Sequence, residues 1–459
     1  MLVISAVRGC GEVSSGVATT WRAAAGTTDG RVLERAWHRG SATPDRLRRV
    51  GVVLVIGCLL TALVSLLGAV SRAGAVRDSD TRIAALTADA AALYQSLADA
   101  DAMATSGYVS GGLEPAAVRA RYDDDVARAA DRLVHAAGQL PEGDPAAGPL
   151  ATIAGQLPIY TAFVETARTY NRLGLPLGQS YLDSASRTMR TAILPAAEEL
   201  RRIKTAELES TYQRGGAIPF VVLLIGVAVL AGVVDVAVLE RRRTNRVLNT
   251  GLVVAGTALA LLALWWIVVA LIVGDALGDA RSHSVGATAL DDARVAAAQA
   301  RTNESLVLVA RSGGSSSSDQ GFTTQLDRVL GVEGNSGLLA DAAAQATDPE
   351  STARVDAIRV AAVAWQEAHR RVRELDDGGN YPDAVASVVG AEPGGSGATF
   401  QRLDTALAGA VDAERAAFAD EVGYARAAQT GLIVVPTLLA LFAAAAVAVG
   451  IGRRVGEYR

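Results

Sequence analysis

Four runs of apolar residues divide the chain, and long polar stretches lie between them. The runs cover about 51–70, 217–239, 251–274 and 430–452. Each has about 20 residues or more and almost no charge, which matches the roughly 30 Å hydrocarbon core of a bilayer. Buried core helices are usually shorter and striped, so the pattern predicts four transmembrane helices. The first run resembles a late signal sequence as well, but its length and the lack of a small-residue cleavage site favour a retained helix.

The stretch 72–216, called the first segment below, has the apolar spacing of helices. Apolar residues three and four positions apart form three seams. These are Ile83, Leu86, Ala90, Leu93, Leu97, Ala100 and Ala104; Ile153, Leu157, Tyr160, Val164 and Ala167; and Met189, Ile193, Ala196, Leu200 and Ile203. Glycine and proline breakers at 111–115, 141–145 and 174–178 separate the helical runs. The pattern predicts four helices with short loops, packed as an up-down-up-down bundle.

The stretch 275–429, called the second segment, has a similar but less regular pattern. Helices are expected over about 280–311 and 350–375, with a Ser-rich break at 312–318 and an interrupted helix around 331–337. Tyr381 is expected to start another helix, because Pro382 and Asp383 suit a first helical turn. The last helix carries an apolar seam back to the fourth run: Leu403, Leu407, Val411, Phe418 and Val422.

The two segments show weak self-similarity at a shift of 202 residues. The shift places Asp101 on Asn303, and it places the Ser-Gly-Gly of 110–112 on that of 312–314. The apolar runs follow in matching order. We therefore interpret the chain as a duplicated unit of span, bundle and span.

The predicted fold is an all-α membrane protein with four transmembrane helices and two extracytoplasmic four-helix bundles. The predicted parts are a disordered cytoplasmic tail at 1–45, spans at 46–71, 217–239, 251–274 and 430–452, bundles at 72–216 and 275–429, an Arg-rich cytoplasmic loop at 240–250 and a cytoplasmic tail at 453–459. The tail at 1–45 lacks helical periodicity, and part of it could lie upstream of the true start.

Clustered arginines set the expected topology, because cytoplasmic flanks of spans are enriched in positive charge. The clusters lie before the first run, between the second and third, and after the fourth. They are Arg46, Arg48 and Arg49; Arg241, Arg242, Arg243 and Arg246; and Arg453, Arg454 and Arg459. With four spans, all three clusters lie on one side, which predicts a multi-pass plasma-membrane protein with both termini in the cytoplasm. The same arginines are candidates for an anionic-lipid or partner contact.

Composition excludes several classes of site. The 459-residue chain is 50% hydrophobic and has a net charge of -5. Its two cysteines, Cys10 and Cys58, lie outside both segments, so neither a disulfide framework nor a cysteine metal site is expected there. No nucleophile, phosphate-binding or metal motif occurs, and basic clusters border only the apolar runs. The sequence therefore predicts no enzyme, no metal, no cofactor and no nucleic-acid partner.

A few polar residues are candidates for function. Asp235 lies inside the second run, where a carboxylate is costly, although snorkelling or pairing with Arg241 is the simpler explanation. Two matched pairs at i,i+3 spacing recur in the segments: Glu165 with Arg168, and Glu367 with Arg370. A surface salt bridge is the simpler explanation for both. The acidic run at 123–125 suggests either a cation site or, more simply, a solvated helix face.

The architecture resembles two known groups of membrane proteins. A helical bundle between two spans is similar to the ligand-binding region of bacterial chemoreceptors and sensor kinases, and the stretch 378–390 with 399–411 resembles the late part of such modules. Two bundles on four spans without an output domain resemble the actinobacterial GlnX-type membrane proteins. That resemblance implies two partners, a solute-binding GlnH-like lipoprotein outside and a PknG-like Ser/Thr kinase inside.

Three functional hypotheses follow. The first is a non-enzymatic transducer that relays amino-acid availability, sensed by the lipoprotein, to the kinase. The second is a direct small-molecule sensor with the ligand bound in a helical bundle. The third is an accessory or coupling subunit of a transport or envelope-assembly complex. A homo-oligomer is compatible with each.

Overall fold

The computed structural model describes residues 43–112, 114–215, 218–244, 249–310, 315–332 and 336–456. About 90% of the chain is helical and no strand occurs among these residues. The prediction of an all-α chain is confirmed. The predicted tail at 1–45 lies almost wholly outside the described residues.

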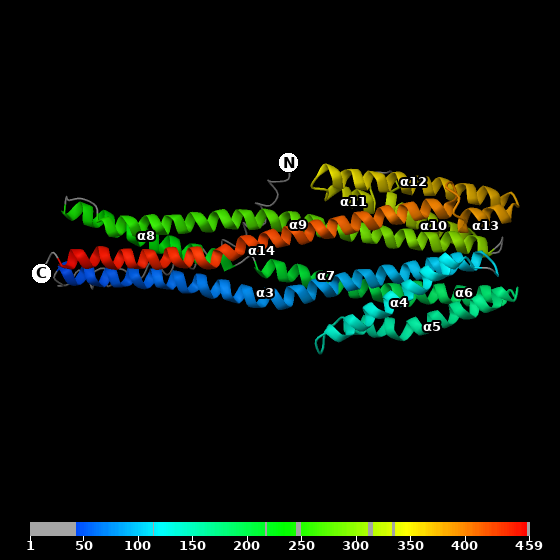
Figure 1. Ribbon diagram of the computed structural model, residues 1–459, viewed down its shortest axis with the longest axis horizontal. Coiled ribbons are helices and arrows are strands. Elements are labelled where there is room, and N and C mark those ends of the chain that lie inside the picture. The colour runs from blue at the N-terminus through cyan, green and yellow to red at the C-terminus, as the bar shows by residue number, and fades with distance from the viewer. Residues whose placement is uncertain are drawn as a thin grey trace, which may run out of the picture. The chain divides into compact units, whose positions relative to one another are not determined.

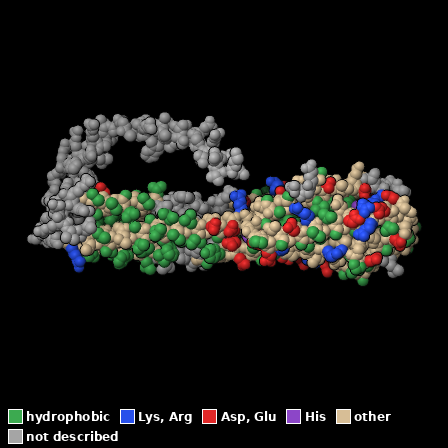
Figure 2. All heavy atoms as spheres, turned by 90° about the horizontal axis from the view of Figure 1, so that it is seen from above, with side chains coloured by type: hydrophobic (Ala, Val, Ile, Leu, Met, Phe, Trp, Pro, Cys, Tyr) green, Lys and Arg blue, Asp and Glu red, His purple; other side chains and the backbone are tan. Residues whose placement is uncertain are grey.

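The chain separates into two compact units. The first unit comprises Met1–Leu63, Leu224–Ala263 and Thr437–Arg459, and the second comprises Val64–Leu223 and Leu264–Pro436. Figure 2 shows mostly hydrophobic side chains on the visible surface of the apolar helices, whereas acidic and basic side chains lie among hydrophobic and other side chains on the second unit. The boundaries between the units fall inside the four apolar runs, so part of each run belongs to the second unit.

The first unit is built from parts of four helices. They are α3 (Thr43–Val109), α8 (Ile218–Thr244), α9 (Thr250–Ala310) and α14 (Ser396–Gly456). Three of these helices are long and apolar enough to cross a membrane, at Arg48–Leu67, within Thr250–Ala310, and at Val435–Arg453. In α8 the apolar stretch found among the described residues is shorter, at Leu224–Val238. Large apolar side chains such as Val53 (63% exposed) and Leu224 (71% exposed) face outward, as a lipid-facing surface requires.

Close packing joins the four helices of the first unit. One buried cluster draws on all of them: Leu54 and Cys58 of α3, Val233 of α8, Leu252, Ala255, Ala258 and Leu259 of α9, and Ala443, Ala444, Val447 and Ile451 of α14. The backbones of α9 and α14 touch where Gly251 faces Gly450, since a Cβ added to Gly251 would lie 2.4 Å from the Cα of Gly450. Asn249 closes the same crossing, because its Nδ2 donates to the carbonyl of Gly450 at 3.0 Å. Small residues at a crossing are the usual means by which membrane helices approach each other.

The first segment forms four helical rods, as its seams predict. Beyond the outer part of α3 they are α4 (Ala116–Gln139), α5 (Ala147–Arg172) and a rod of three consecutive pieces, α6 (Leu177–Thr188), η1 (Met189–Ile193) and α7 (Leu194–Gly215). Every residue of the first two predicted seams is buried, and the third is buried or partly buried. Pro115 precedes the first turn of α4 in an extended conformation.

The π-helical piece η1 was not predicted from the sequence. A π-turn widens the helix by one residue, and such turns occur often at functional positions. Met189 and Ile193, which begin and end η1, are both fully buried. The extra residue therefore adjusts the register between α6 and α7 while keeping both seam residues in the core.

The second segment also consists of helices. Between α9 and α14 lie α10 (Ser315–Leu330), α11 (Leu338–Ala344), α12 (Pro349–Asp377) and α13 (Tyr381–Val389). The expected interruption after α10 is present, with Gly331 and Gly337 at φ of 82° and 100°, a region that favours glycine. Asp348 caps α12 by accepting a bond from the backbone nitrogen of Ser351 at 2.8 Å. The predicted helix start at Tyr381 is confirmed.

The two segments share one hydrophobic core. A single buried cluster contains residues of α3 to α7 and of α9 to α12 and α14. Figure 1 shows α9 and α14 flanked by α10 to α13 within the second segment, and α4, α5 and α6 grouped together within the first. Side-chain contacts join the two, as when Ser106 of α3 meets Ser305 of α9 at 3.2 Å between hydroxyl oxygens. The segments are therefore packed as one folding unit.

Candidate functional site

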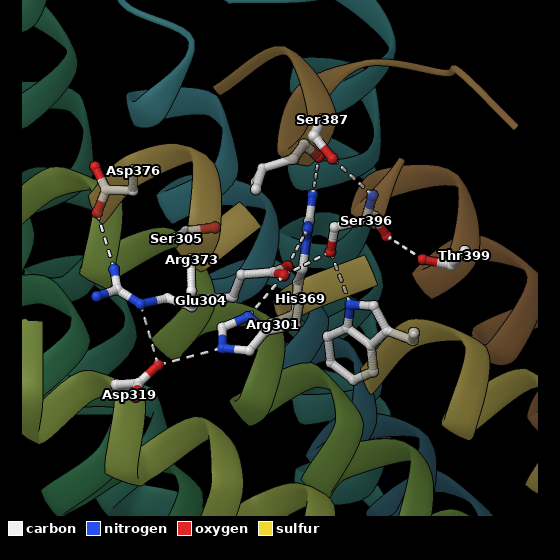
Figure 3. A network of polar contacts seen from close by, with 12 residues as sticks. Arg301, Glu304, Ser305, Asp319, His369, Arg373, Asp376, Ser387, Ser396 and Thr399 are labelled. Carbon is white, nitrogen blue, oxygen red and sulfur yellow. Dashed lines mark hydrogen bonds and ion pairs between the residues drawn. The ribbon is translucent and has the colours of Figure 1, made fainter. Parts of the chain in front are cut away.

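A buried carboxylate on α9 organises the densest polar network of the second unit. Glu304 is fully buried, with 0% of its side chain exposed. Its oxygens accept from Nη1 of Arg301 at 2.5 Å, from the hydroxyl of Ser396 at 2.5 Å, and contact Nδ1 of His369 at 3.0 Å (Figure 3). Arg301 lies one turn before Glu304 on the same helix, so i,i+3 spacing brings them together. The network thereby joins α9 to α12 and α14.

Aromatic rings enclose this network on its apolar side. The His369 ring stacks on Phe322 with centroids 3.5 Å apart. Trp365, one turn before His369 on α12, donates from Nε1 to the hydroxyl of Ser396 at 2.9 Å, and its ring packs against Phe322 and Phe400. Burial of such rings excludes water and strengthens the enclosed electrostatic contacts.

Electrostatics keep Glu304 ionised. Burial by itself raises the pKa of a carboxyl, but the charge of Arg301 and the hydrogen bonds from His369 and Ser396 outweigh it and lower the pKa of Glu304 to about 2. A carboxylate with that pKa is not a proton donor or acceptor near neutral pH. Glu304 therefore acts as a fixed anion, and its contacts hold α9 to α12 and α14.

A second polar site is a charged cleft between α3, α4, α9 and α14. Two aspartates and two arginines alternate there. Arg121 reaches Asp404 at 2.6 Å and Asp99 at 3.4 Å, and Arg294 reaches Asp404 at 2.6 Å and Asp99 at 3.9 Å. The arginines come from α4 and α9, so the cluster connects the first segment to the second. We call the opening beside it, about 550 Å³ in volume, the charged cleft.

Small and polar side chains leave the charged cleft open. Ala92, Ala117 and Ala120 line it together with polar and charged residues. They are Gln95, Ser96, Asp99, Arg121, Asp124, Asp125, Arg128, Arg294 and Asp404. A volume of this size is in the range of small-molecule sites in proteins.

Charges in the cleft shift the protonation of its carboxyls. Burial and the charge of Asp404 raise the pKa of Asp99, whereas Arg294 and Arg121 outweigh burial and lower the pKa of Asp404. Burial, followed by the charge of Asp99, raises the pKa of Asp125 from 3.8 to about 7. Asp125 is 1% exposed, although it forms an ion pair with Arg128. It therefore takes up a proton near neutral pH.

This arrangement predicts an unusual pH dependence. The folded-state pKa of Asp125 is raised, so between about pH 7 and pH 4 the native state binds more protons than the unfolded state. The stabilisation from protonated Asp125 is fully present below the pKa of this carboxyl in the unfolded chain. It is lost as the pH rises through the folded-state pKa of about 7. The change from 3.8 to about 7 corresponds to at most about 4 kcal/mol.

Replacing Asp125 with asparagine is expected to raise the stability of α4 at pH 8 and to flatten this pH dependence. Hydrogen exchange of α4 amides, measured on the purified chain in lipid nanodiscs between pH 5 and pH 8, reads out the effect locally. Protection of α4 that increases from pH 5 to pH 8 in the unmodified protein contradicts the expectation.

The two predicted i,i+3 pairs have different surroundings. Arg168 is buried; it contacts Glu165 at 2.8 Å and Glu114 at 2.9 Å, and its guanidinium lies 4.1 Å from the ring centroid of Tyr122. Arg168 thereby attaches α5 to Tyr122 of α4 and to Glu114, which lies two residues before α4 begins. Glu367 and Arg370 also pair, at 2.5 Å, but both are exposed on α12. The structure brings each pair together and does not bring the two pairs into one site.

The candidate residues near the apolar runs are only partly described. Asp235 is exposed on α8. Arg453 is exposed at the end of α14. The side chains of Arg241, Arg242, Arg243, Arg246 and Arg454 lie outside the described residues, so their predicted roles stay predictions.

The contacts of the three histidines described by the structure were not predicted from the sequence. His369 lies in the Glu304 network, and His283 is buried with Nδ1 2.6 Å from Glu414. His135 contacts Asp89 at 2.5 Å. Each partner is at least 46 positions away in the sequence, so no local spacing reveals it. Over the described ranges, no group of three or more His, Cys, Asp or Glu residues has the geometry of a metal site.

Comparison with known proteins finds a similarity to a sensor domain in these helices. The family model described as an actinobacterial sensor domain matches residues 75–213, which include the outer part of α3 and the rods from α4 to α7. No curated protein and no solved structure matches the chain. The sensor-domain match supports an actinobacterial sensor protein, and it indicates a sensing or signalling role.

Proposed function

We propose that the protein is a non-enzymatic transmembrane signal transducer. The observation that carries this proposal is the sensor-domain match at 75–213, because it begins on α3, the helix that also contains the candidate span Arg48–Leu67. Two further helices, α9 and α14, likewise include both a candidate span and residues of the shared core. A continuous helix is a route by which a change in packing outside moves residues inside.

The signal in this proposal is extracellular amino-acid availability. A GlnH-like solute-binding lipoprotein senses the amino acid, and a PknG-like kinase receives the output in the cytosol. The resemblance of the chain's architecture to GlnX-type membrane proteins supports this assignment. The first apolar run is retained, the protein is multi-pass, and both termini are cytoplasmic.

The test of the external step is a binding experiment. The purified chain in nanodiscs is mixed with the solute-binding lipoproteins of the same organism, each with and without its amino acid. Binding that changes with the solute supports the relay. If no such lipoprotein binds in either state, the relay through a lipoprotein is rejected.

The cytoplasmic step is expected to depend on the arginine loop. Changing Arg241, Arg242 and Arg243 together to glutamine removes both the topology signal and the charge available to a partner. We expect either misinsertion, detected by accessibility of cysteines placed in the two segments, or normal insertion with loss of the downstream phosphorylation response. Normal insertion, abundance and response would show that 240–250 is only a connector.

Direct sensing is a second candidate function, and the charged cleft favours it. The cleft is large enough for a small solute and is bordered by both segments. A ligand there contacts the first segment through α4 and the second through α9 and α14. Its occupancy therefore affects how the segments pack.

A further inference from the structure

The acidic run Asp123, Asp124 and Asp125 separates into three environments on α4. Asp123 is exposed and pairs with Arg119 at 3.0 Å. Asp124 is also exposed but lines the charged cleft. Asp125 lines the cleft as well and is 1% exposed. The simple expectation of a solvated acidic face therefore holds for Asp123 and is wrong for Asp125.

Two buried carboxylate oxygens of residues that line the cleft have no hydrogen-bond partner. They are Oδ1 of Asp99 and Oδ2 of Asp125. Asp99 is 3% exposed and Asp125 is 1% exposed. A buried acceptor without a donor costs about 1–3 kcal/mol, and more when it is charged. Such atoms are rare in folded proteins and call for a missing donor.

The charge balance of the cleft also favours a ligand that donates hydrogen bonds. Asp99 and Asp404 are matched by Arg121 and Arg294, and Asp125 is matched by Arg128. Asp124 has no ion pair among the residues that the structure describes. With every group ionised, the cleft therefore has one more negative than positive charge, so an occupant that supplies donors and one positive charge completes it.

We propose that the charged cleft binds a small organic molecule through a primary ammonium group, which donates to the unpartnered oxygens of Asp99 and Asp125. An ammonium has three donors and no acceptor, so it suits a site with surplus acceptors. Each of the three arginines that line the cleft already pairs with a carboxylate, so none of their charges is left over for an anionic ligand. The inference rests on the proposed sensing role and specifies the class of ligand for it.

Protonation of Asp125 is expected to make ligand affinity at the charged cleft depend on pH. A proton on Asp125 competes with the ammonium, and the raised pKa of that carboxyl places the competition near neutral pH. The facing charged groups from the packed helices are Asp99 of α3, Arg121, Asp124 and Arg128 of α4, Arg294 of α9 and Asp404 of α14. The arginines stay charged throughout this range, so affinity for an alkylammonium is expected to rise between pH 6 and pH 8.

The experiment uses the full chain in nanodiscs and charge-matched probes. Binding of n-butylammonium, putrescine and L-lysine is measured by titration calorimetry and by thermal stabilisation, with butyrate as the anionic counterpart. Asp125→Asn is expected to weaken binding of the amines by at least about tenfold, the loss associated with a hydrogen bond to a charged group. Asp123→Asn, two positions away on the same helix and outside the cleft, is the matched control and is expected to leave affinity within about twofold.

Several results would overturn the proposal. They are absence of amine binding at millimolar concentration, equal binding of butyrate, or an Asp125→Asn variant that binds as the unmodified chain does. Hydrogen exchange of α4 verifies that the Asp125→Asn variant is folded. The lipoprotein assay is independent of these titrations, so the cleft proposal and the transducer proposal fail or succeed separately.

Discussion

Replacing Glu304 with alanine is expected to cost about 3–5 kcal/mol of stability in the second unit, because it leaves a buried charge without its partner. Arg301 is 4% exposed and contacts Glu304 and the carbonyl of Val388. Once Glu304 is removed, the guanidinium loses its anion, and His369 and Ser396 lose an acceptor. Chemical unfolding of the purified chain, followed by the fluorescence of Trp365 against a background without the other tryptophans, measures the loss.

Two control variants distinguish loss of the buried network from a general effect of substituting a glutamate. Glu367→Ala removes an exposed partner of Arg370 from the same set of helices, and it is expected to have no measurable effect, since surface ion pairs contribute little. Glu304→Gln keeps the shape and an acceptor, so it is expected to lie between the two. Equal stability of the Glu304→Ala and Glu367→Ala variants would mean that the buried network does not hold the helices together.

Replacing Gly450 with leucine is expected to destabilise the first unit by about 1–3 kcal/mol, as overpacking does. A Cβ at Gly450 would lie 2.9 Å from the Cα of Gly251 and 3.0 Å from Oδ1 of Asn249. Backbone cannot move aside as a flexible side chain can, so α9 and α14 must separate. Thermal unfolding in nanodiscs measures the destabilisation, and cysteine crosslinking between the two helices measures the separation.

The control for this change lies on the same helix. Gly452 is two residues further along α14, and a Cβ there meets nothing within 4 Å. Gly452→Leu has the same change in composition and helix propensity as Gly450→Leu but makes no clash. If both variants lose stability equally, helix propensity or lipid contact is the cause, and the crossing at Gly251 is not a packing constraint.

The sequence predicts the helices of this protein well, because their signals are local. The seam from Ile83 to Ala104 and the breakers between rods depend on neighbours within one or two turns. Helix class, rod number in the first segment and the interruption after α10 follow from such spacing. The apolar runs similarly indicate membrane spans from length and composition alone.

The polar sites could not be predicted in the same way. Arg168 and Arg370 have identical i,i+3 glutamates, yet only Arg168 is buried, because Glu114 and Tyr122 reach it from elsewhere in the fold. Asp125 differs from Asp123 only by its direction from the helix axis. The acidic partner of His369 within the core, Glu304, is 65 positions away. These contacts are set by packing between helices, which a single sequence does not encode in its spacing.

Because the two segments share one core, the number of ligands that one chain binds at the cleft can be predicted. Two identical subunits packed in this way would repeat every side chain across their axis, so any interface site would appear twice with the same residues. In this chain the two segments differ at the positions that a shift of 202 matches: Asp99 corresponds to Arg301, and Asp101 corresponds to Asn303. The carboxylate that lines the cleft from the first segment thus corresponds to the arginine that pairs with Glu304 in the second. One chain accordingly offers a single, unsymmetrical cleft, and saturation at one ligand per chain distinguishes it from a receptor built of two equal halves.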